Sequence, residues 1–164
     1  MEFAALDAKR HDRQGFDCGV EALNLYLQRY ANQDARRGLA KTYVLAEGSE
    51  IVGYYAISAH SVIRGDLPAH LATGPYAELP FLLLGRLAVA RAHQGRGYGD
   101  VMIAHAFATT RRVAAEVGIL GMIVDAKDER AAAFYEGFGF MRLIASPNRL
   151  VLPLSAMDKA LDSA

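Results

Sequence analysis

The sequence contains little cysteine, no tryptophan, no net charge and no long hydrophobic run. Cys18 is the only cysteine among 164 residues, so no disulfide can form within the chain, and a lone thiol is typical of the reducing cytoplasm. No apolar segment of the secretory-signal kind follows Met1, and the longest apolar run, residues 79–84, is far shorter than the roughly 20 residues that cross a bilayer. We therefore expect a soluble, cytoplasmic protein with no membrane partner.

The charge balance excludes a generally basic, nucleic-acid-coating surface, because 18 lysines and arginines meet 18 acids. Arginine still dominates one stretch: from Arg86 to Arg112 there are five arginines, and Asp100 is the only acid. This local excess suits a phosphorylated ligand. Scattered, solvated arginines explain the charge equally well.

Length and composition predict one domain over residues 1–164, since domains usually hold roughly 100–200 residues. Asp17 is a candidate N-cap for a helix whose apolar residues recur at helical spacing as far as Ala35. Lys41–Glu47 and Ile51–His60 are rich in β-branched and aromatic residues and predict a hairpin. Residues 64–80 contain three prolines and predict an ordered loop with one short helix at 68–71.

The second half of the chain alternates apolar runs with helical patterns. Phe81–Ala90 and Ile119–Ala126 predict buried strands, and Tyr98–Val117 predicts the helix between them. Asp128–Phe138 predicts a short helix capped by Asp128, followed by a closing antiparallel pair around 146–148. The expected fold is a mixed α/β domain, with a central mixed β-sheet flanked by helices.

Between the strand and the long helix lies the glycine-rich segment "QGRGYG", Gln94 to Gly99. A strand, a glycine loop and a helix N-terminus make a good anion site, because unpaired backbone N–H groups point at the ligand and no Cβ blocks its approach. The spacing excludes a dinucleotide fingerprint, since Asp100 stands where a third glycine is needed, and a P-loop, since the lysine is missing. A tight turn without a ligand stays an alternative.

The segment also matches the [QR]-x-x-G-x-[GA] motif of the GNAT superfamily of acyl-CoA-dependent N-acetyltransferases. The preceding "RLAV" stands where that family has its central strand, and "DERAAAFYEGFGF" resembles its C-terminal signature. From Phe16 to Leu154, the chain further resembles the GNAT toxins of bacterial toxin–antitoxin modules. That resemblance implies acetylation of the α-amino group of aminoacyl-tRNA with acetyl-CoA, and hence a block of translation.

The resemblance also implies partners and site residues. The partners would be a ribbon-helix-helix antitoxin and a second copy of the chain in a homodimer. Operator DNA would be bound only through the antitoxin complex, in which the toxin acts as a co-repressor. Tyr135 is the expected proton donor to the leaving thiolate, although without the motif it reads as a helix aromatic packed on the sheet. The residues expected to hold acetyl-CoA are Leu87, Ala88, Val89, Gln94, Gly95, Arg96, Gly97, Tyr98, Gly99, Asp128, Ala132 and Phe134.

The strand before the cradle has no carboxylate or histidine to serve as a general base. An α-amine, with a pKa near 8, needs less help to lose its proton than a lysine side chain near 10.4, so the sequence favours an α-amine acceptor. The candidate tRNA contacts are Arg29, Arg36, Arg37, Arg86, Arg91 and Arg149. An alternative is that these arginines simply form part of a solvated surface.

The remaining reactive side chains predict structural roles. His93 reads as a solvated loop residue, His105 as a helix residue and Cys18 as a partly buried thiol, and nothing spaces them as metal ligands or as a relay. Two other functions stay open. One is acetylation of a small-molecule amine or a protein, and the other is a non-catalytic GNAT module that acts as a binding partner or co-repressor.

Overall fold

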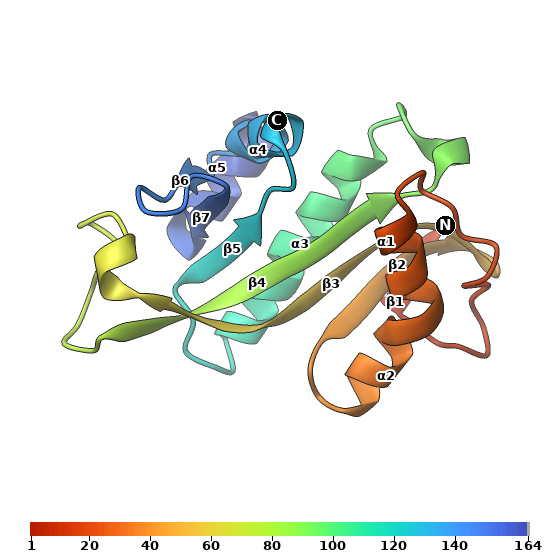
Figure 1. The fold of residues 1–164 in the computed structure, drawn as a ribbon, viewed down its shortest axis with the longest axis horizontal. Helices are drawn as coiled ribbons and strands as arrows, with labels where there is room; N and C mark the ends of the chain where they lie inside the picture. Colours follow the sequence, from red (N-terminus) through yellow and green to blue (C-terminus); the bar gives the residue numbers. More distant parts are fainter. Residues whose placement is uncertain (164) are drawn as a thin grey trace. The chain divides into compact units, whose positions relative to one another are not determined.

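The structure, a computed structural model, describes residues 1–163 (Figure 1). Seven strands hydrogen bond in the order β1-β2-β3-β4-β5-β7-β6, which confirms the expected mixed sheet flanked by helices. By its internal contacts the chain forms two compact units. Unit 1 comprises Met1–Ser58 and Gly85–Ala106, and unit 2 comprises Ala59–Leu84 and the chain from Phe107 onward.

The sheet of unit 1 is antiparallel at its start. β1 (Glu2–Ala5) pairs with β2 (Lys41–Glu47), and β2 pairs with β3 (Glu50–Ile63), as the predicted hairpin requires. β1 was not predicted, because four residues at a sheet edge carry too short a pattern to distinguish a strand from a loop.

Adjacent residues of β3 face opposite sides of this sheet, as the pleat requires. Tyr54 donates its hydroxyl proton to the carbonyl of Leu23 at 2.7 Å, so its face is covered by the first helix. Tyr55 lies 2.8 Å from the imidazole of His105, so its face is covered by the long helix α3 (Tyr98–Ala114) (Figure 1). Both tyrosine side chains are fully buried.

The first helical segment differs from the prediction. It consists of α1 (Glu21–Leu25), a π-helical turn η1 (Tyr26–Tyr30) and α2 (Ala31–Arg36). The predicted Asp17 cap is wrong: the N-cap is Val20, and the Asp17 carboxylate accepts hydrogen bonds from the backbone N–H of Gly19 at 2.8 Å and from Asn24 Nδ2 at 3.1 Å.

Unit 2 contains the parallel pair of the sheet. β4 (Glu78–Val89) pairs in parallel with β5 (Gly121–Asp125), and β5 pairs antiparallel with β7 (Arg149–Pro153). β6 (Met141–Arg142) pairs antiparallel with β7, which confirms the closing pair. A Cβ on Gly121 would lie 2.2 Å from the carbonyl oxygen of Leu152, so β5 and β7 meet where only glycine fits.

Besides the second half of α3, unit 2 contains the helices α4 (Glu129–Glu136) and α5 (Met157–Ser163). The predicted cap of α4 is confirmed, because the Asp128 carboxylate accepts a hydrogen bond from the backbone N–H of Ala131 at 2.8 Å. α5 was not predicted, since it is short and follows no marked apolar period. No helix among residues 1–163 is long and apolar enough to cross a bilayer.

The loop before β4 is ordered by one arginine rather than by the helix predicted at 68–71, which is wrong. A 3-10 turn lies earlier, at Arg64–Asp66. The Arg64 guanidinium donates to the carbonyl oxygens of Ala72, at 2.6 Å, and Tyr76, at 2.9 Å. Proline and glycine leave this segment few helical hydrogen bonds, and the guanidinium satisfies its carbonyl groups instead.

Candidate functional site

The glycine-rich segment forms an open cradle in unit 1, between β4 and α3. A 3-10 turn, η3 (Arg91–His93), leads into it, and α3 begins at Tyr98. Gly95 and Gly97 have φ of +78° and +83°, a conformation that side chains with a Cβ rarely adopt. A Cβ at either position would meet nothing within 4 Å, so the space in front of them is open to a ligand.

The backbone donors of this cradle face no protein partner. Within residues 1–163, the N–H groups of Gly95, Arg96 and Gly97 donate to no protein acceptor. Together with the N–H groups of Tyr98 to Asp100, which precede the first hydrogen bond of α3 from Val101 to Gly97 O, they form an anion site of the kind that binds phosphate. Arg96 is exposed and adds a positive charge to this segment.

Gln94 braces the entrance to the cradle. Its side-chain Nε2 donates to the carbonyl oxygens of Cys18 and Val89, each at 2.9 Å, and its backbone N–H donates to Arg91 O at 3.3 Å. These donors are therefore used inside the protein, and the donors open to a ligand begin at Gly95.

His93 is not the solvated loop residue that was predicted. Its side chain is only 14% exposed, its Nε2 lies 2.8 Å from a carboxylate oxygen of Glu50, and its ring packs edge-on against Tyr98. The interaction joins residues 43 apart, so no local pattern in the sequence signals it. His105, stacked on Phe3 at 3.8 Å, confirms the prediction of a structural helix residue.

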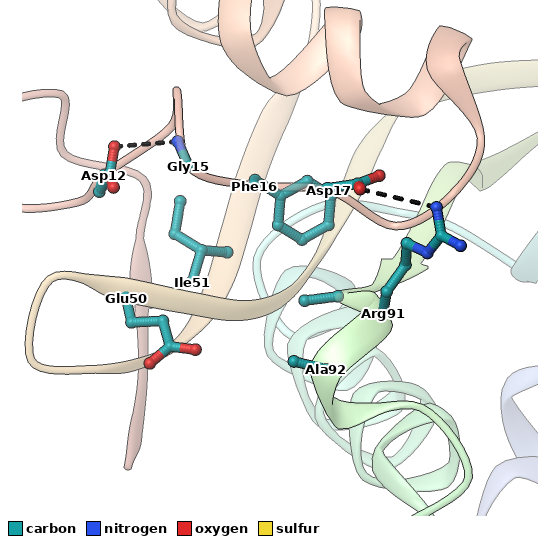
Figure 2. A pocket seen from close by; sticks show the side chains of 9 residues that line it. Asp12, Gly15, Phe16, Asp17, Glu50, Ile51, Arg91 and Ala92 are labelled. Atoms are coloured by element: carbon teal, nitrogen blue, oxygen red, sulfur yellow. Dashed lines mark hydrogen bonds and ion pairs between the residues drawn. The ribbon is translucent and has the colours of Figure 1, made fainter.

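A separate cavity of about 250 Å³ lies beside the segment that leads into the cradle (Figure 2). Three carboxylates line it, those of Asp12, Asp17 and Glu50, and Arg91 pairs with Asp17 at 3.8 Å. Three acids against one guanidinium repel a polyanion, so this cavity does not suit a pyrophosphate.

The last residues of β4 point to alternate sides of the sheet. Ala88 is buried in the core beneath the first helix, whereas Leu87 and Val89 are half-buried. Arg86 shares a face with Ala88, and its guanidinium carbon lies 3.5 Å from the centre of the Tyr26 ring.

Tyr135, the predicted proton donor, lies on α4 in unit 2. Its ring packs against Phe134 and Phe140, with centroid separations of 5.3 and 5.5 Å. Burial raises the pKa of the Tyr135 phenol to about 12, so the hydroxyl keeps its proton at neutral pH. Within residues 1–160, this hydroxyl makes no hydrogen bond and can donate to a ligand.

The candidate RNA-binding arginines differ in exposure and in partners. Arg86 is half-buried, whereas Arg29, Arg36, Arg37 and Arg91 are exposed, the last of them paired with Asp17. Arg149 instead donates to both carboxylate oxygens of Asp125, at 2.7 and 2.9 Å, which offsets its charge. The described residues contain no cluster of three potential metal ligands.

The family model of the acetyltransferase (GNAT) domain matches residues 38–142. The chain belongs to the GNAT acetyltransferase family. It is therefore an acetyltransferase that uses acetyl-CoA as its co-substrate, as the resemblance of its motifs to that family implied.

Two relatives resemble this GNAT chain over most of their length. A tRNA-acetylating toxin of Mycobacterium tuberculosis is 31% identical over 86% of the chain and 85% of the relative. A probable toxin TacT of Sinorhizobium fredii is 28% identical over 93% of the chain and 90% of the relative.

Solved structures show the same fold. AtaT in complex with acetyl-methionyl-tRNAfMet superimposes with a TM-score of 0.88 at 33% identity, covering 96% of this chain and 97% of that one. AtaTR bound with acetyl-CoA has a TM-score of 0.84 at 34% identity and covers 96% of both chains. AtaT bound to the C-terminus of the antitoxin AtaR has a TM-score of 0.83 at 31% identity, again covering 96% of both.

Proposed function

We propose that this GNAT enzyme is a toxin that transfers the acetyl group of acetyl-CoA to the α-amino group of an aminoacyl-tRNA and so blocks translation. The observation that carries the proposal is the likeness, over nearly the whole chain, to the toxin AtaT in complex with acetyl-methionyl-tRNAfMet. The second support is the open phosphate cradle, because a transferase of this family must first hold its acyl donor.

Three segments are proposed to bind the donor. The amides from Gly95 to Gly99 and the side chain of Arg96 would hold the pyrophosphate, with Gln94 bracing the loop. The backbone of Leu87 to Val89 would pair with the pantetheine arm and polarise the thioester carbonyl. Asp128 would order the start of α4, and Ala132 and Phe134 would contact the donor from that helix.

Acetyl-CoA supplies the thioester: the amine nitrogen forms a bond to the acetyl carbon, the carbon–sulfur bond breaks, and the sulfur leaves with the bonding electrons. Tyr135 is proposed to donate a hydrogen bond to that sulfur. A thiol has a pKa near 8.5, well below the pKa of about 12 of this phenol, so stabilisation of the thiolate by a hydrogen bond is favoured over full proton transfer.

The acceptor amine must lose a proton, and Phe81–Val89 provides no carboxylate or histidine to take it. An aminoacyl ester lowers the pKa of its α-amine below the usual value near 8, so a large share is already neutral and water can accept the proton. Arg29, Arg36, Arg37 and Arg86 are proposed to contact tRNA phosphates. Arg91 and Arg149 are proposed to play a smaller part, because Asp17 and Asp125 offset their charges.

The proposal includes partners. Complexes of AtaT with AtaR, and of AtaT–AtaR with DNA, support a cognate antitoxin for this chain and DNA binding only through it. We further propose a ribbon-helix-helix antitoxin, co-repression of the shared operon, a homodimer, a cytoplasmic location and a single catalytic domain over residues 1–164.

The central test combines a transfer assay with the Tyr135→Phe variant. Incubated with labelled acetyl-CoA and total charged tRNA, the wild-type chain should yield N-acetylated aminoacyl-tRNA, and mass spectrometry identifies the amino acid. Tyr135→Phe should lower kcat by about 10²–10⁴-fold, the usual contribution of a positioned proton donor, and should relieve growth arrest in cells.

The same assay separates the alternatives. Unchanged acetyl-CoA binding by Tyr135→Phe would show that the variant is folded. Efficient acetylation of an amine metabolite or a protein, with charged tRNA left untouched, would replace the proposed substrate. Growth arrest that persists in Tyr135→Phe would point to a non-catalytic binding role.

A further inference from the structure

The π-helical turn η1 places an aromatic ring under the one cation of β4. Tyr26 is the first residue of this turn, and the Arg86 guanidinium carbon lies 3.5 Å from the centre of its ring. Single π-turns within α-helices occur frequently at functional sites, because they shift side chains out of the regular helical register.

The Tyr26 ring is held rigidly. Its side chain is buried, with 4% exposure, and its hydroxyl donates to a carboxylate oxygen of Asp34 at 2.9 Å. It stacks on Tyr54 with a centroid separation of 6.4 Å and an interplanar angle of 19°. Burial and the nearby Asp34 raise the pKa of the Tyr26 phenol, so the ring stays neutral beneath the guanidinium.

Stacking uses the flat face of a guanidinium and leaves its five edge N–H donors unused. Within residues 1–160, Arg86 makes no ion pair and no hydrogen bond, whereas Arg91, Arg142 and Arg149 all pair with carboxylates. Arg86 is therefore a half-buried, oriented cation with no counter-charge. Such an edge matches the two oxygens of a phosphate group.

Arg86 also stands next to the predicted reaction centre. It directly precedes Leu87, the first of the residues proposed to bind the pantetheine arm, and consecutive Cα atoms lie about 3.8 Å apart. Its side chain leaves the strand on the side of the first helix, opposite to that of Leu87.

We infer that Arg86 binds a backbone phosphate near the 3′ end of the acceptor tRNA, and that Tyr26, held by Asp34, is the residue that positions it. This inference rests on the proposed function and assigns to unit 1 a contact that binds the acceptor tRNA. Aromatic stacking fixes the plane of the guanidinium, so that binding the phosphate costs little side-chain entropy.

The salt dependence of binding tests the phosphate contact. The dissociation constant of total charged tRNA is measured over a series of salt concentrations for the wild type, Arg86→Gln and Arg10→Gln. Loss of one phosphate contact should lower the slope of log K against log[salt] by about 0.7–0.9 in Arg86→Gln. Arg10→Gln removes an exposed cation that pairs with Glu2 and should keep the wild-type slope.

A double-mutant cycle tests the positioning role of Tyr26. Tyr26→Leu should raise the KM for charged tRNA by about tenfold and leave the KM for acetyl-CoA unchanged. It should add little in the Arg86→Gln background, because both changes remove the same contact. Tyr26→Phe loses the hydrogen bond to Asp34 but keeps the buried ring stacked on Tyr54, so its affinity should lie between those of the wild type and Tyr26→Leu. An unchanged KM for acetyl-CoA in both variants excludes a core defect as the explanation.

The outcomes separate two failures. If the wild type transfers no acetyl group to charged tRNA, the proposed function fails and this inference with it. If the wild type transfers acetyl but Arg86→Gln keeps the wild-type salt slope, the phosphate contact at Arg86 is overturned. If the effects of Tyr26→Leu and Arg86→Gln simply add, or the KM for acetyl-CoA rises equally, Tyr26 is a structural residue.

Discussion

At the scale of single residues, partners decide what an arginine does. Arg86 and Arg149 look alike in the sequence, and both are candidate RNA contacts. Arg149 is bidentate to Asp125, and its Nη1 also lies 2.8 Å from His60 Nε2, so its donors are largely used within the protein. Arg86 rests on an aromatic ring and keeps its donors for a ligand.

The same contacts predict a pH dependence of stability. Burial and the Arg149 cation lower the pKa of His60 below its usual value near 6.5. Between the lowered pKa of the folded state and about pH 6.5, the unfolded chain binds more protons at this site than the folded chain does. The free energy of unfolding therefore rises with pH in this range, and this contribution is lost as pH falls through the folded-state pKa. The pH dependence of the free energy of unfolding, from urea titrations, should therefore flatten in this range in His60→Asn. An unaltered profile in His60→Asn would contradict the assignment.

At the scale of elements, the cradle depends on backbone conformation more than on side chains. Gly97 has a φ of +83°, and a Cβ there would project into the open space in front of the cradle. Gly97→Ala should cost about 1–2 kcal/mol of unfolding free energy, since a Cβ disfavours this conformation, and should weaken acetyl-CoA binding in calorimetry. Gly118→Ala is the matched control: its φ is ordinary, it too has open space, and its stability should stay within about 0.5 kcal/mol. Normal acetyl-CoA binding by Gly97→Ala would remove the cradle from the donor site.

At the scale of the whole molecule, donor binding should appear as thermal stabilisation. A ligand at 100 times its Kd adds about 2.7 kcal/mol, and each kcal/mol raises the Tm of a chain of this size by roughly 2–4 °C, so CoA should raise the Tm by roughly 5–10 °C. Pantetheine at the same concentration lacks the pyrophosphate and should raise it far less. Equal shifts with both compounds in a thermal melt would show that the pyrophosphate is not held by the cradle.

The sequence by itself determined the features that act over short distances. β2, β5, α3 and α4 follow from apolar period, and the Asp128 cap and the glycine cradle depend on residues adjacent in the chain. The motifs that place the chain in its family are of this contiguous kind, and the family match confirms what they implied.

The tertiary structure alone decided which distant groups meet. Segments far apart in the chain meet in four places: the pairing of the edge strand β1 with β2, the Glu50–His93 contact, the stacking of Arg86 on Tyr26 and the pairing of Arg149 with Asp125. Local sequence patterns reflect interactions within a few residues, whereas these contacts form only when burial of the core brings separate strands and helices together. For this protein, the acyl donor could therefore be inferred from the sequence, but the residues proposed to hold the acceptor required the fold.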